Sequence, residues 1–344
     1  MNMYLLPFLE AFFFTVIFVL ILIPLAKKLN WKARQTSRHI HDAEVFRIGG
    51  LAMVPAFALV VAMNPDLVVS AELAGFLGAS FILLLVGFWD DWREIFWKTQ
   101  LFFQMSVASL VFILGVRIYY VTNPLGGGVI DLDLGRTVLV SLALVVFWII
   151  FVINAINWVD GVDGLSGGIV LIAIFSTFFL SFKPEVNQPP MAILSSILAG
   201  TVLAFLVFNF YPAKILAGTS GAMFMGFSLA VLAIFSGTKI ATALLVLTIP
   251  TIDFFWVIAG RWRSGRSIFQ PDKNHLHHKL LEIGWSQRKI ALCYYGATAL
   301  VAFVALSTRM IGKGIAILVS VAVMLFISFL IRKKALTVFQ AKKD

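Results

Sequence analysis

The chain has 344 residues, of which 60% are hydrophobic and only 13% are charged. Soluble domains carry roughly twice that charged fraction, so the composition excludes a protein whose main solvent is water. The net charge of +10 raises nucleic acid as a partner, but the cations are dispersed among apolar runs without a basic-aromatic module, which argues against that partner. The lone Cys293 excludes an internal disulfide framework.

Apolar runs of about 20 residues recur along the whole chain, and each is long enough to cross a hydrocarbon core of roughly 30 Å as a helix. The first run contains Glu10 and lacks a basic start and a small-residue cleavage site, so we expect it to be retained. Eleven spans are predicted, or ten if the short eighth does not cross, at residues 5–26, 49–63, 73–89, 99–116, 137–156, 165–182, 191–210, 222–236, 240–260, 290–307 and 314–331. The expected fold is all-α, a single polytopic transmembrane domain over residues 1–344.

The distribution of Lys and Arg predicts the orientation. If the N-terminus is outside, the inner segments hold 21 of the 27 basic residues and the outer loops hold six. Basic loops stay on the cytoplasmic side, which places the C-terminus there. The cytoplasmic loops are then about 27–48, 90–98, 157–168, 211–221 and 261–289, and they contain all five histidines. Transporters more often place ionisable groups near the midplane, so we expect the chemistry at a cytoplasmic membrane edge.

The third predicted span ends in the acidic pair Asp90 and Asp91, followed by Glu94. Adjacent carboxylates at a membrane-facing helix end are costly unless a cation or a proton compensates them. If the helix continues, Asp90 and Glu94 share one face. Neighbouring carboxylates of this kind are suited to binding Mg²⁺ or to general-base catalysis. The alternative is a solvated acidic turn that ends a span.

The fifth predicted span ends in a polar segment at residues 154–168 that contains two amides, two carboxylates and four glycines. Asn154, Asn157 and Asp160 are three residues apart, so a helix would align them, and Asp163 follows. The glycines let the backbone approach a ligand closely. No Gly-Lys-Ser/Thr follows, which excludes a nucleotide P-loop. This segment is therefore predicted to be functional.

The loop after the ninth predicted span contains Arg266 and the compact segment His275-Leu276-His277-His278. Arginine binds diphosphates through its bidentate fork, and histidine donates, accepts or transfers protons near neutral pH. We expect contact with phosphate or diphosphate. Zinc is an alternative with no Cys partner, and attraction of anionic lipid headgroups is another.

These three segments, in this order, resemble the polyprenyl-phosphate N-acetylhexosamine-1-phosphate transferase family. The matched signatures are the Asp-Asp pair, the Asn-x-x-Asn-x-x-Asp-Gly-x-Asp-Gly-Leu segment and the His-x-His-His loop. Arg38 and His41 ahead of Gly49-Gly50 are weaker matches, as is the segment at residues 208–214. The resemblance implies transfer of a sugar phosphate from a UDP-amino sugar to polyprenyl phosphate with release of UMP, and Mg²⁺ or alternatively Mn²⁺ as cofactor.

The resemblance also implies residue roles. Asp90 would deprotonate or orient the lipid phosphate, and Asp91 and Asp163 would bind the metal. Asn157 and Asp160 would hold sugar, uridine or metal-bound water. The remaining expected substrate-binding residues are Arg38, His41, Asn154, Arg266, His275, His277 and His278.

Two departures from the family pattern stand out. Thr219 occupies the position of an Asp that the family uses as a Mg²⁺ ligand, and residues 44–46 replace family prolines. Thr219 is thus a doubtful metal ligand, and a catalytically impaired member is one alternative.

The branch of the family is indicated by Glu94. The translocase that transfers phospho-MurNAc-pentapeptide typically has Lys there, so the chain is more similar to the branch that transfers N-acetylglucosamine-1-phosphate. A lipid-linked sugar transporter is the alternative without chemistry. Expected partners are UDP-N-acetylhexosamine, polyprenyl phosphate and the bacterial plasma membrane, with a homodimer as an open expectation.

Overall fold

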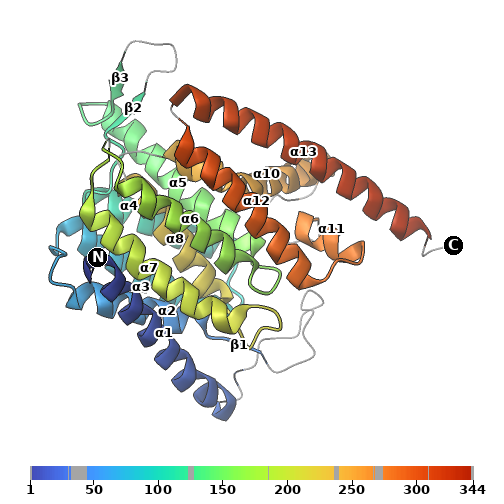
Figure 1. Cartoon of the computed structure of the whole chain (residues 1–344), viewed down its shortest axis with the longest axis horizontal. Helices are drawn as coiled ribbons and strands as arrows, with labels where there is room; N and C mark the ends of the chain where they lie inside the picture. The colour runs from blue at the N-terminus through green and yellow to red at the C-terminus, as the bar shows by residue number, and fades with distance from the viewer. Residues whose placement is uncertain are drawn as a thin grey trace.

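The computed structural model describes residues 2–29, 31, 45–122, 128–184, 186–235, 240–265, 267, 274–308 and 310–341. The described chain is a bundle of helices with two small pairs of strands (Figure 1). The helices are α1 (Asn2–Lys28), α2 (Gly49–Met63), α3 (Ala71–Arg93), α4 (Trp97–Ile113), α5 (Thr137–Val159), α6 (Leu165–Ser181), α7 (Pro189–Asn209), α8 (Gly218–Phe235), α9 (Ile240–Val246), α10 (Thr248–Arg263), α11 (Leu276–Glu282), α12 (Gln287–Ser307) and α13 (Met310–Ala341).

Each predicted span coincides with a helix, or with the pair α9 and α10, which meet at a bend of 77°. By length and composition, seven helices among the described residues are able to cross a membrane, or eight if the bent pair forms one span. The helices α2, α4 and α6 have 15, 17 and 17 residues. At 1.5 Å per residue they are about 22–26 Å long, shorter than a hydrocarbon core of roughly 30 Å. The chain is thus an all-α polytopic membrane protein, and the number of eleven spans stays a prediction.

Two short strand pairs were not predicted, because strands of two or three residues leave no periodicity in a sequence. β1 (Phe46–Arg47) pairs in parallel with β4 (Ile215–Leu216), so that Arg47 lies opposite Leu216. β2 (Tyr120–Thr122) and β3 (Val129–Asp131) form an antiparallel hairpin. The first pair joins the segment before α2 to the segment before α8.

The helix α8 is the centre of the bundle and packs against α2, α3 and α5. In the most apolar 18-residue stretch of α8, 83% of the residues are buried inside the protein, whereas in that of α13 only 6% are buried. Lipid tails are as apolar as leucine, so exposed apolar side chains on α13 are stable in a bilayer without protein partners. Figure 1 shows α13 along the outer edge of the bundle, with its C-terminal end projecting past the neighbouring helices.

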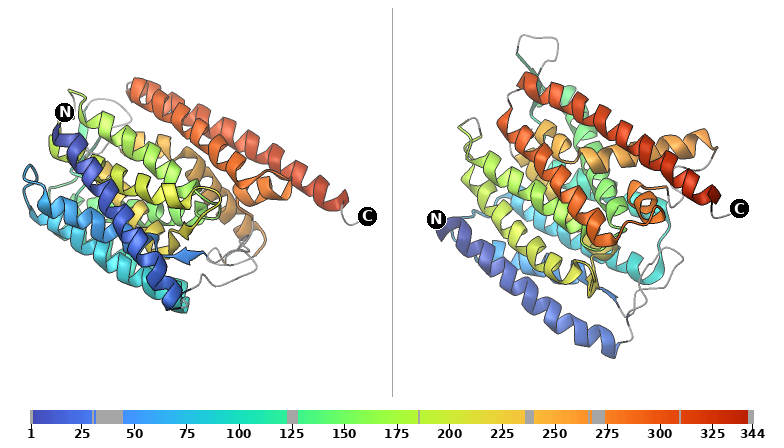
Figure 2. Two further views of the ribbon diagram at one scale, coloured as in Figure 1. Left: turned by 60° about the horizontal axis from the view of Figure 1, so that its bottom comes forward. Right: turned by 45° about the vertical axis from the view of Figure 1, so that its right-hand side comes forward.

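The bundle has two distinct ends. The β2–β3 hairpin projects from one end, and β1 lies toward the other, near the last residues of α1, while α11 lies beside the first residues of α12 (Figure 2). Each of α3, α5 and α7 is followed by a helix that runs back in the opposite direction, so α3, α5, α7 and α10 all finish at the end that carries β1 and α11. The polar motifs identified in the sequence occupy the helix termini at this end.

Candidate functional site

The acidic pair lies in the last turn of α3. The helix stops at Arg93 because Glu94 adopts a left-handed backbone, with φ 50° and ψ 80°. The helix does not continue through Glu94, so Asp90 and Glu94 do not share a helix face, and Glu94 is exposed. Oδ1 of Asp90 accepts hydrogen bonds from the backbone N–H of Ile95 over 3.0 Å and from the side-chain amide of Gln100 over 2.7 Å. These donors fix the orientation of the Asp90 carboxylate.

The Asp91 carboxylate is buried against the first turn of α8. Its oxygens accept hydrogen bonds from the backbone N–H groups of Thr219 over 2.9 Å and Ser220 over 3.3 Å. These donors have no partner within their own helix, and the positive end of the α8 dipole favours a carboxylate there. Gly218, with φ +68°, allows this contact, since a Cβ on it would lie 2.5 Å from Oδ2 of Asp91. Asp91 therefore caps α8 from a different helix.

Thr219 bridges the two carboxylates. Besides its backbone bond to Asp91, its hydroxyl donates to Oδ2 of Asp90 over 2.6 Å. The side chain that stands in place of the expected metal-binding carboxylate is thus a hydrogen-bond donor to the acidic pair.

Arg47 places a positive charge beside the acidic pair and was missed as a site residue. Nη1 of Arg47 lies 3.6 Å from Oδ1 of Asp91, and the Asp91 side chain is only 1% exposed. The β1–β4 pairing holds Arg47 beside the start of α8. In the sequence Arg47 contributed only to the charge bias. The signal that points to it is its place two residues before Gly49-Gly50.

The amide and carboxylate segment lies at the end of α5 and in the turn to α6. Asn154 and Asn157 are both on α5, whereas Asp160 follows its last residue. The side-chain amide of Asn154 donates to Gln104 over 2.7 Å, so it ties α5 to α4. Asn157 is half-buried. The three-residue spacing thus places the two amides on one helix, with the carboxylate just beyond it.

Asp160 and Asp163 have different surroundings. Oδ1 of Asp160 accepts a hydrogen bond from the hydroxyl of Ser166 over 2.5 Å. Burial raises the pKa of Asp160 to about 6, against the opposing effects of the Ser166 hydrogen bond and the Arg47 charge. Asp163 is buried, and its Oδ2 accepts from the backbone N–H of Ala213 over 3.0 Å. The charge of Asp160 therefore changes near pH 6.

The histidine segment forms the start of α11. His275 precedes the helix, and its Nδ1 lies 2.8 Å from Oδ2 of Asp253 on α10. His277 is 1% exposed, and neither of its ring nitrogens has a hydrogen-bond partner among the described residues. Its ring faces the turn after α5, since a Cβ on Gly161 would lie 2.4 Å from Nε2 of His277. His278 is half-buried, with its ring centroid 4.3 Å from that of His277.

The structure thus brings the three motifs together. The acidic pair contacts α8 and Arg47. Asn209 accepts a hydrogen bond from Gly164 of the α5–α6 turn and donates one to Ile215 of β4, which pairs with the strand of Arg47. Gly161 of the same turn contacts His277. A further contact comes from Gln287 at the start of α12, whose side-chain oxygen accepts from the backbone N–H of Asp163 over 3.0 Å. Three expected substrate-binding residues, Arg38, His41 and Arg266, lie outside the described residues.

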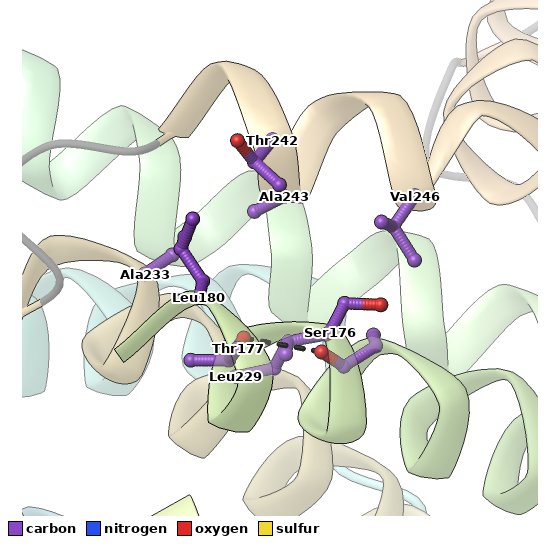
Figure 3. Close-up of a pocket in the computed structure, with 9 residues that line it drawn as sticks. Ser176, Thr177, Leu180, Leu229, Ala233, Thr242, Ala243 and Val246 are labelled. Carbon is purple, nitrogen blue, oxygen red and sulfur yellow. Dashed lines mark hydrogen bonds between the residues drawn. The ribbon is translucent and has the colours of Figure 1, made fainter. Parts of the chain in front are cut away.

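A cavity elsewhere in the bundle does not belong to this site. Figure 3 shows it between α6, α8 and α9, with Ser176 and Thr177 on its wall. Its volume is about 10 Å³, no more than one water occupies. The hydroxyls of Ser176 and Thr177 donate to carbonyls of their own helix. Ser176 also lies about 15 Å along α6 from Ser166 at 1.5 Å per residue.

The metal-ligating side chains and their hydrogen bonds limit how the site is able to hold a metal ion. Among the described residues, no group of three or more His, Cys, Asp or Glu side chains is arranged to hold one, which leaves the zinc alternative without support there. Mg²⁺ needs only one or two carboxylates when phosphate oxygens complete its shell. The carboxylates of Asp90 and Asp91 already accept bonds from protein donors, and Arg47 adds positive charge. This arrangement fits an ion that arrives with a diphosphate, rather than one held by protein groups alone.

Comparisons with known proteins agree with the sequence resemblance. The sequence profile of glycosyl transferase family 4 matches residues 73–237. A decaprenyl-phosphate N-acetylglucosaminephosphotransferase of Mycobacterium leprae is 37% identical over 83% of this chain and 78% of its own length. A probable undecaprenyl-phosphate N-acetylglucosaminyl 1-phosphate transferase of Bacillus subtilis is 27% identical over 83% of this chain and 80% of its own. A phospho-N-acetylmuramoyl-pentapeptide-transferase of Symbiobacterium thermophilum is 30% identical over 80% of this chain and 87% of its own.

Proposed function

Because the chain belongs to glycosyl transferase family 4, we propose that it transfers N-acetylglucosamine-1-phosphate from UDP-N-acetylglucosamine to a polyprenyl phosphate and releases UMP. The observation that carries the proposal is the meeting of the acidic pair, the α5–α6 turn and the histidine segment beside Arg47 at one end of the bundle. The names of the mycobacterial and Bacillus relatives support this acceptor class and sugar.

The reaction joins two phosphates, so charge is the main obstacle. An oxygen of the lipid phosphate attacks the β-phosphorus of the nucleotide sugar, a P–O bond to that phosphorus forms, and the bond to the UMP oxygen breaks. Phosphoryl transfer needs positioning and neutralisation of oxygen charge more than covalent participation by the protein. In this proposal Arg47 and the histidines contact phosphate oxygens, and the fixed carboxylate of Asp90 orients the lipid phosphate and accepts its proton.

Mg²⁺, with Mn²⁺ as the alternative, is the proposed cofactor. When bound, such an ion neutralises the charge of the diphosphate. Asp163 and Asp91 would hold it together with phosphate oxygens. Asn157 and Asp160 would contact the sugar, the uridine or metal-bound water. The preference of Mg²⁺ for few carboxylates plus substrate phosphates supports this division.

The proposed location of the site is the cytoplasmic face of the bacterial plasma membrane. The excess of basic residues at the ends that carry the motifs supports an outer N-terminus and a cytoplasmic C-terminus. A membrane-embedded catalyst suits an acceptor whose phosphate lies at the interface and whose polyprenyl tail lies in lipid. The reaction would then be the first membrane step of a cell-envelope glycan pathway.

The test is UMP release by the purified full-length protein in detergent with undecaprenyl phosphate, Mg²⁺ and a panel of UDP-sugars. We expect release with UDP-N-acetylglucosamine and lipid phosphate together, and none when either is omitted. Preference for UDP-MurNAc-pentapeptide would instead assign the translocase activity that the name of the Symbiobacterium relative describes. No release with any donor would leave a transporter or an inactive family member.

A further inference from the structure

A second polar cluster lies beside the histidine segment, inside the apolar helix α10. Asp253 is 4% exposed, and a carboxylate at such a position is costly unless it is paired. Oδ2 of Asp253 lies 2.8 Å from Nδ1 of His275, and Oδ1 accepts a hydrogen bond from the backbone N–H of Leu276 over 2.7 Å. Nη2 of Arg332, on α13, lies 3.6 Å from Oδ1.

The bond to the ring selects one tautomer of His275. A carboxylate is an acceptor, so Nδ1 carries the proton and Nε2 is the ring nitrogen left for a ligand. The bond to Leu276 acts on the backbone instead, because Leu276 is the first residue of α11 and its N–H has no partner within that helix. One carboxylate therefore sets both the ring of His275 and the start of the helix that carries His277 and His278.

Arg332 extends the cluster to the C-terminal helix. Its guanidinium lies near the Asp253 carboxylate and 5.2 Å from the ring centroid of Trp256. The helix α13 is otherwise largely exposed. The pairing offsets the buried negative charge and links α13 to α10 and α11.

We propose that Asp253 is a positioning residue for the transferase: it holds His275 and the start of α11 so that the histidines face the diphosphate. This inference rests on the proposed function. Hydrogen-bond partners that orient a metal-binding histidine are typically worth about 10–100-fold in metal affinity or activity, and we expect an effect of that order for a histidine that binds phosphate. If Asp253 serves only the fold, its substitution lowers activity by the same factor whether or not His275 is present. If it acts through His275, its substitution causes no further loss once His275 has been replaced.

A double-mutant cycle separates these roles. We expect Asp253→Asn and His275→Gln each to lower kcat/KM for UMP release about 10–100-fold, and the double variant to be no worse than the poorer single variant. Asp253→Glu, which keeps the charge, should retain intermediate activity. The matched control is Asp133→Asn, because Asp133 pairs with Arg117 over 3.4 Å but is exposed and far from the histidines, beside the β2–β3 hairpin. Wild-type activity in Asp253→Asn, or multiplicative losses in the double variant, would overturn the proposal.

A second measurement is independent of activity. In protein labelled with ¹⁵N in the histidine rings, we expect a hydrogen-bonded Nδ1–H resonance that is absent from both His275→Gln and Asp253→Leu, because leucine has no acceptor. Its persistence in Asp253→Leu would refute the positioning contact even if the wild-type protein releases no UMP. If the wild-type protein releases no UMP but the resonance behaves as expected, only the proposed function is refuted. If the Asn or Leu variant does not fold, Asp253→Glu replaces it: the longer side chain should lower activity and shift the Nδ1–H resonance, and wild-type values of both would overturn the proposal.

Discussion

The hydroxyl of Thr219 donates a hydrogen bond to Oδ2 of Asp90 over 2.6 Å. The donor comes from the first turn of α8 and the acceptor from the last turn of α3, so a single contact joins the central helix to the proposed catalytic carboxylate. A carboxylate at position 219 would place a like charge against Asp90. A threonine instead donates a hydrogen bond to Asp90 and directs its second oxygen.

Removal of this hydroxyl should lower the rate of transfer. A hydrogen bond to a charged group is worth about 1.5–3 kcal/mol. If this bond acts mainly by orienting Asp90 for the reaction, its loss corresponds to a roughly 10–150-fold lower rate of transfer. We expect a loss of that size in Thr219→Val, which keeps the shape of the side chain, and little loss in Thr219→Ser, which keeps the hydroxyl. The measurement is initial UMP release at matched amounts of folded protein. Equal rates for the two variants would show that the hydroxyl does not orient Asp90.

The same position should control how a divalent ion is held. Because the described site has few carboxylates free of protein donors, we expect Mn²⁺ to bind wild-type protein only when UDP-N-acetylglucosamine is present. Thr219→Asp adds a carboxylate and should raise affinity without nucleotide on the order of tenfold or more. Electron paramagnetic resonance of free Mn²⁺ measures this directly. Thr219→Asn is the neutral control of equal size, and identical titrations for both variants would place the ion away from residue 219.

Charge at two carboxylates should be required for transfer. In Asp90→Asn the Thr219 hydroxyl is able to rotate and accept from the new amide, and in Asp163→Asn the amide oxygen still accepts from Ala213. Both variants should therefore fold. We expect transfer of labelled sugar phosphate to fall about 10²–10⁴-fold in Asp90→Asn, the usual contribution of a general base, and to fall severely in Asp163→Asn.

The exposed Asp66, in the connection between α2 and α3, provides the comparison for these two changes. Asp66→Asn should leave transfer unchanged. Turnover close to that of the wild type in Asp90→Asn or Asp163→Asn would remove the assigned role from that residue.

Much of the fold was predictable because a long apolar run in an integral membrane protein has few alternatives to a helix. The motif segments were predictable for the opposite reason, since their amides, carboxylates and histidines interrupt apolar sequence. Glu94 shows the limit of this reasoning: helix periodicity placed it beside Asp90, but the chain leaves the helix at Glu94 itself.

The contacts that the sequence did not indicate join distant segments. Arg47 reaches Asp91 only because two-residue strands pair across almost 170 positions. Asp253 was visible as an ionisable residue in a span, but its partners His275 and Arg332 lie on other helices or loops. Such pairings depend on how helices pack, and local patterns carry no information about that.

Stability should depend on pH through His277. Burial, together with the neighbouring His278 and His275, holds the pKa of His277 well below its ordinary value of 6.5. The unfolded chain then binds a proton on this ring as the pH falls through 6.5, whereas the folded protein does not, so acid favours unfolding. Below pH 6.5 the resulting loss in the free energy of unfolding approaches about 1.4 kcal/mol per pH unit. We expect Tm to fall between pH 7.5 and pH 5.5 through this group.

His277→Gln isolates this effect, because the glutamine does not titrate. Asp160 acts in the opposite direction: its pKa is raised to about 6, so the folded state binds the extra proton and this group favours folding as the pH falls from about 6 toward 4. Both proteins contain Asp160, so the difference between their Tm profiles reports His277 alone. We expect a shallower fall of Tm in the variant from pH 7.5 to pH 5.5. Parallel profiles would mean that His277 is protonated, or exposed to solvent, in the folded protein.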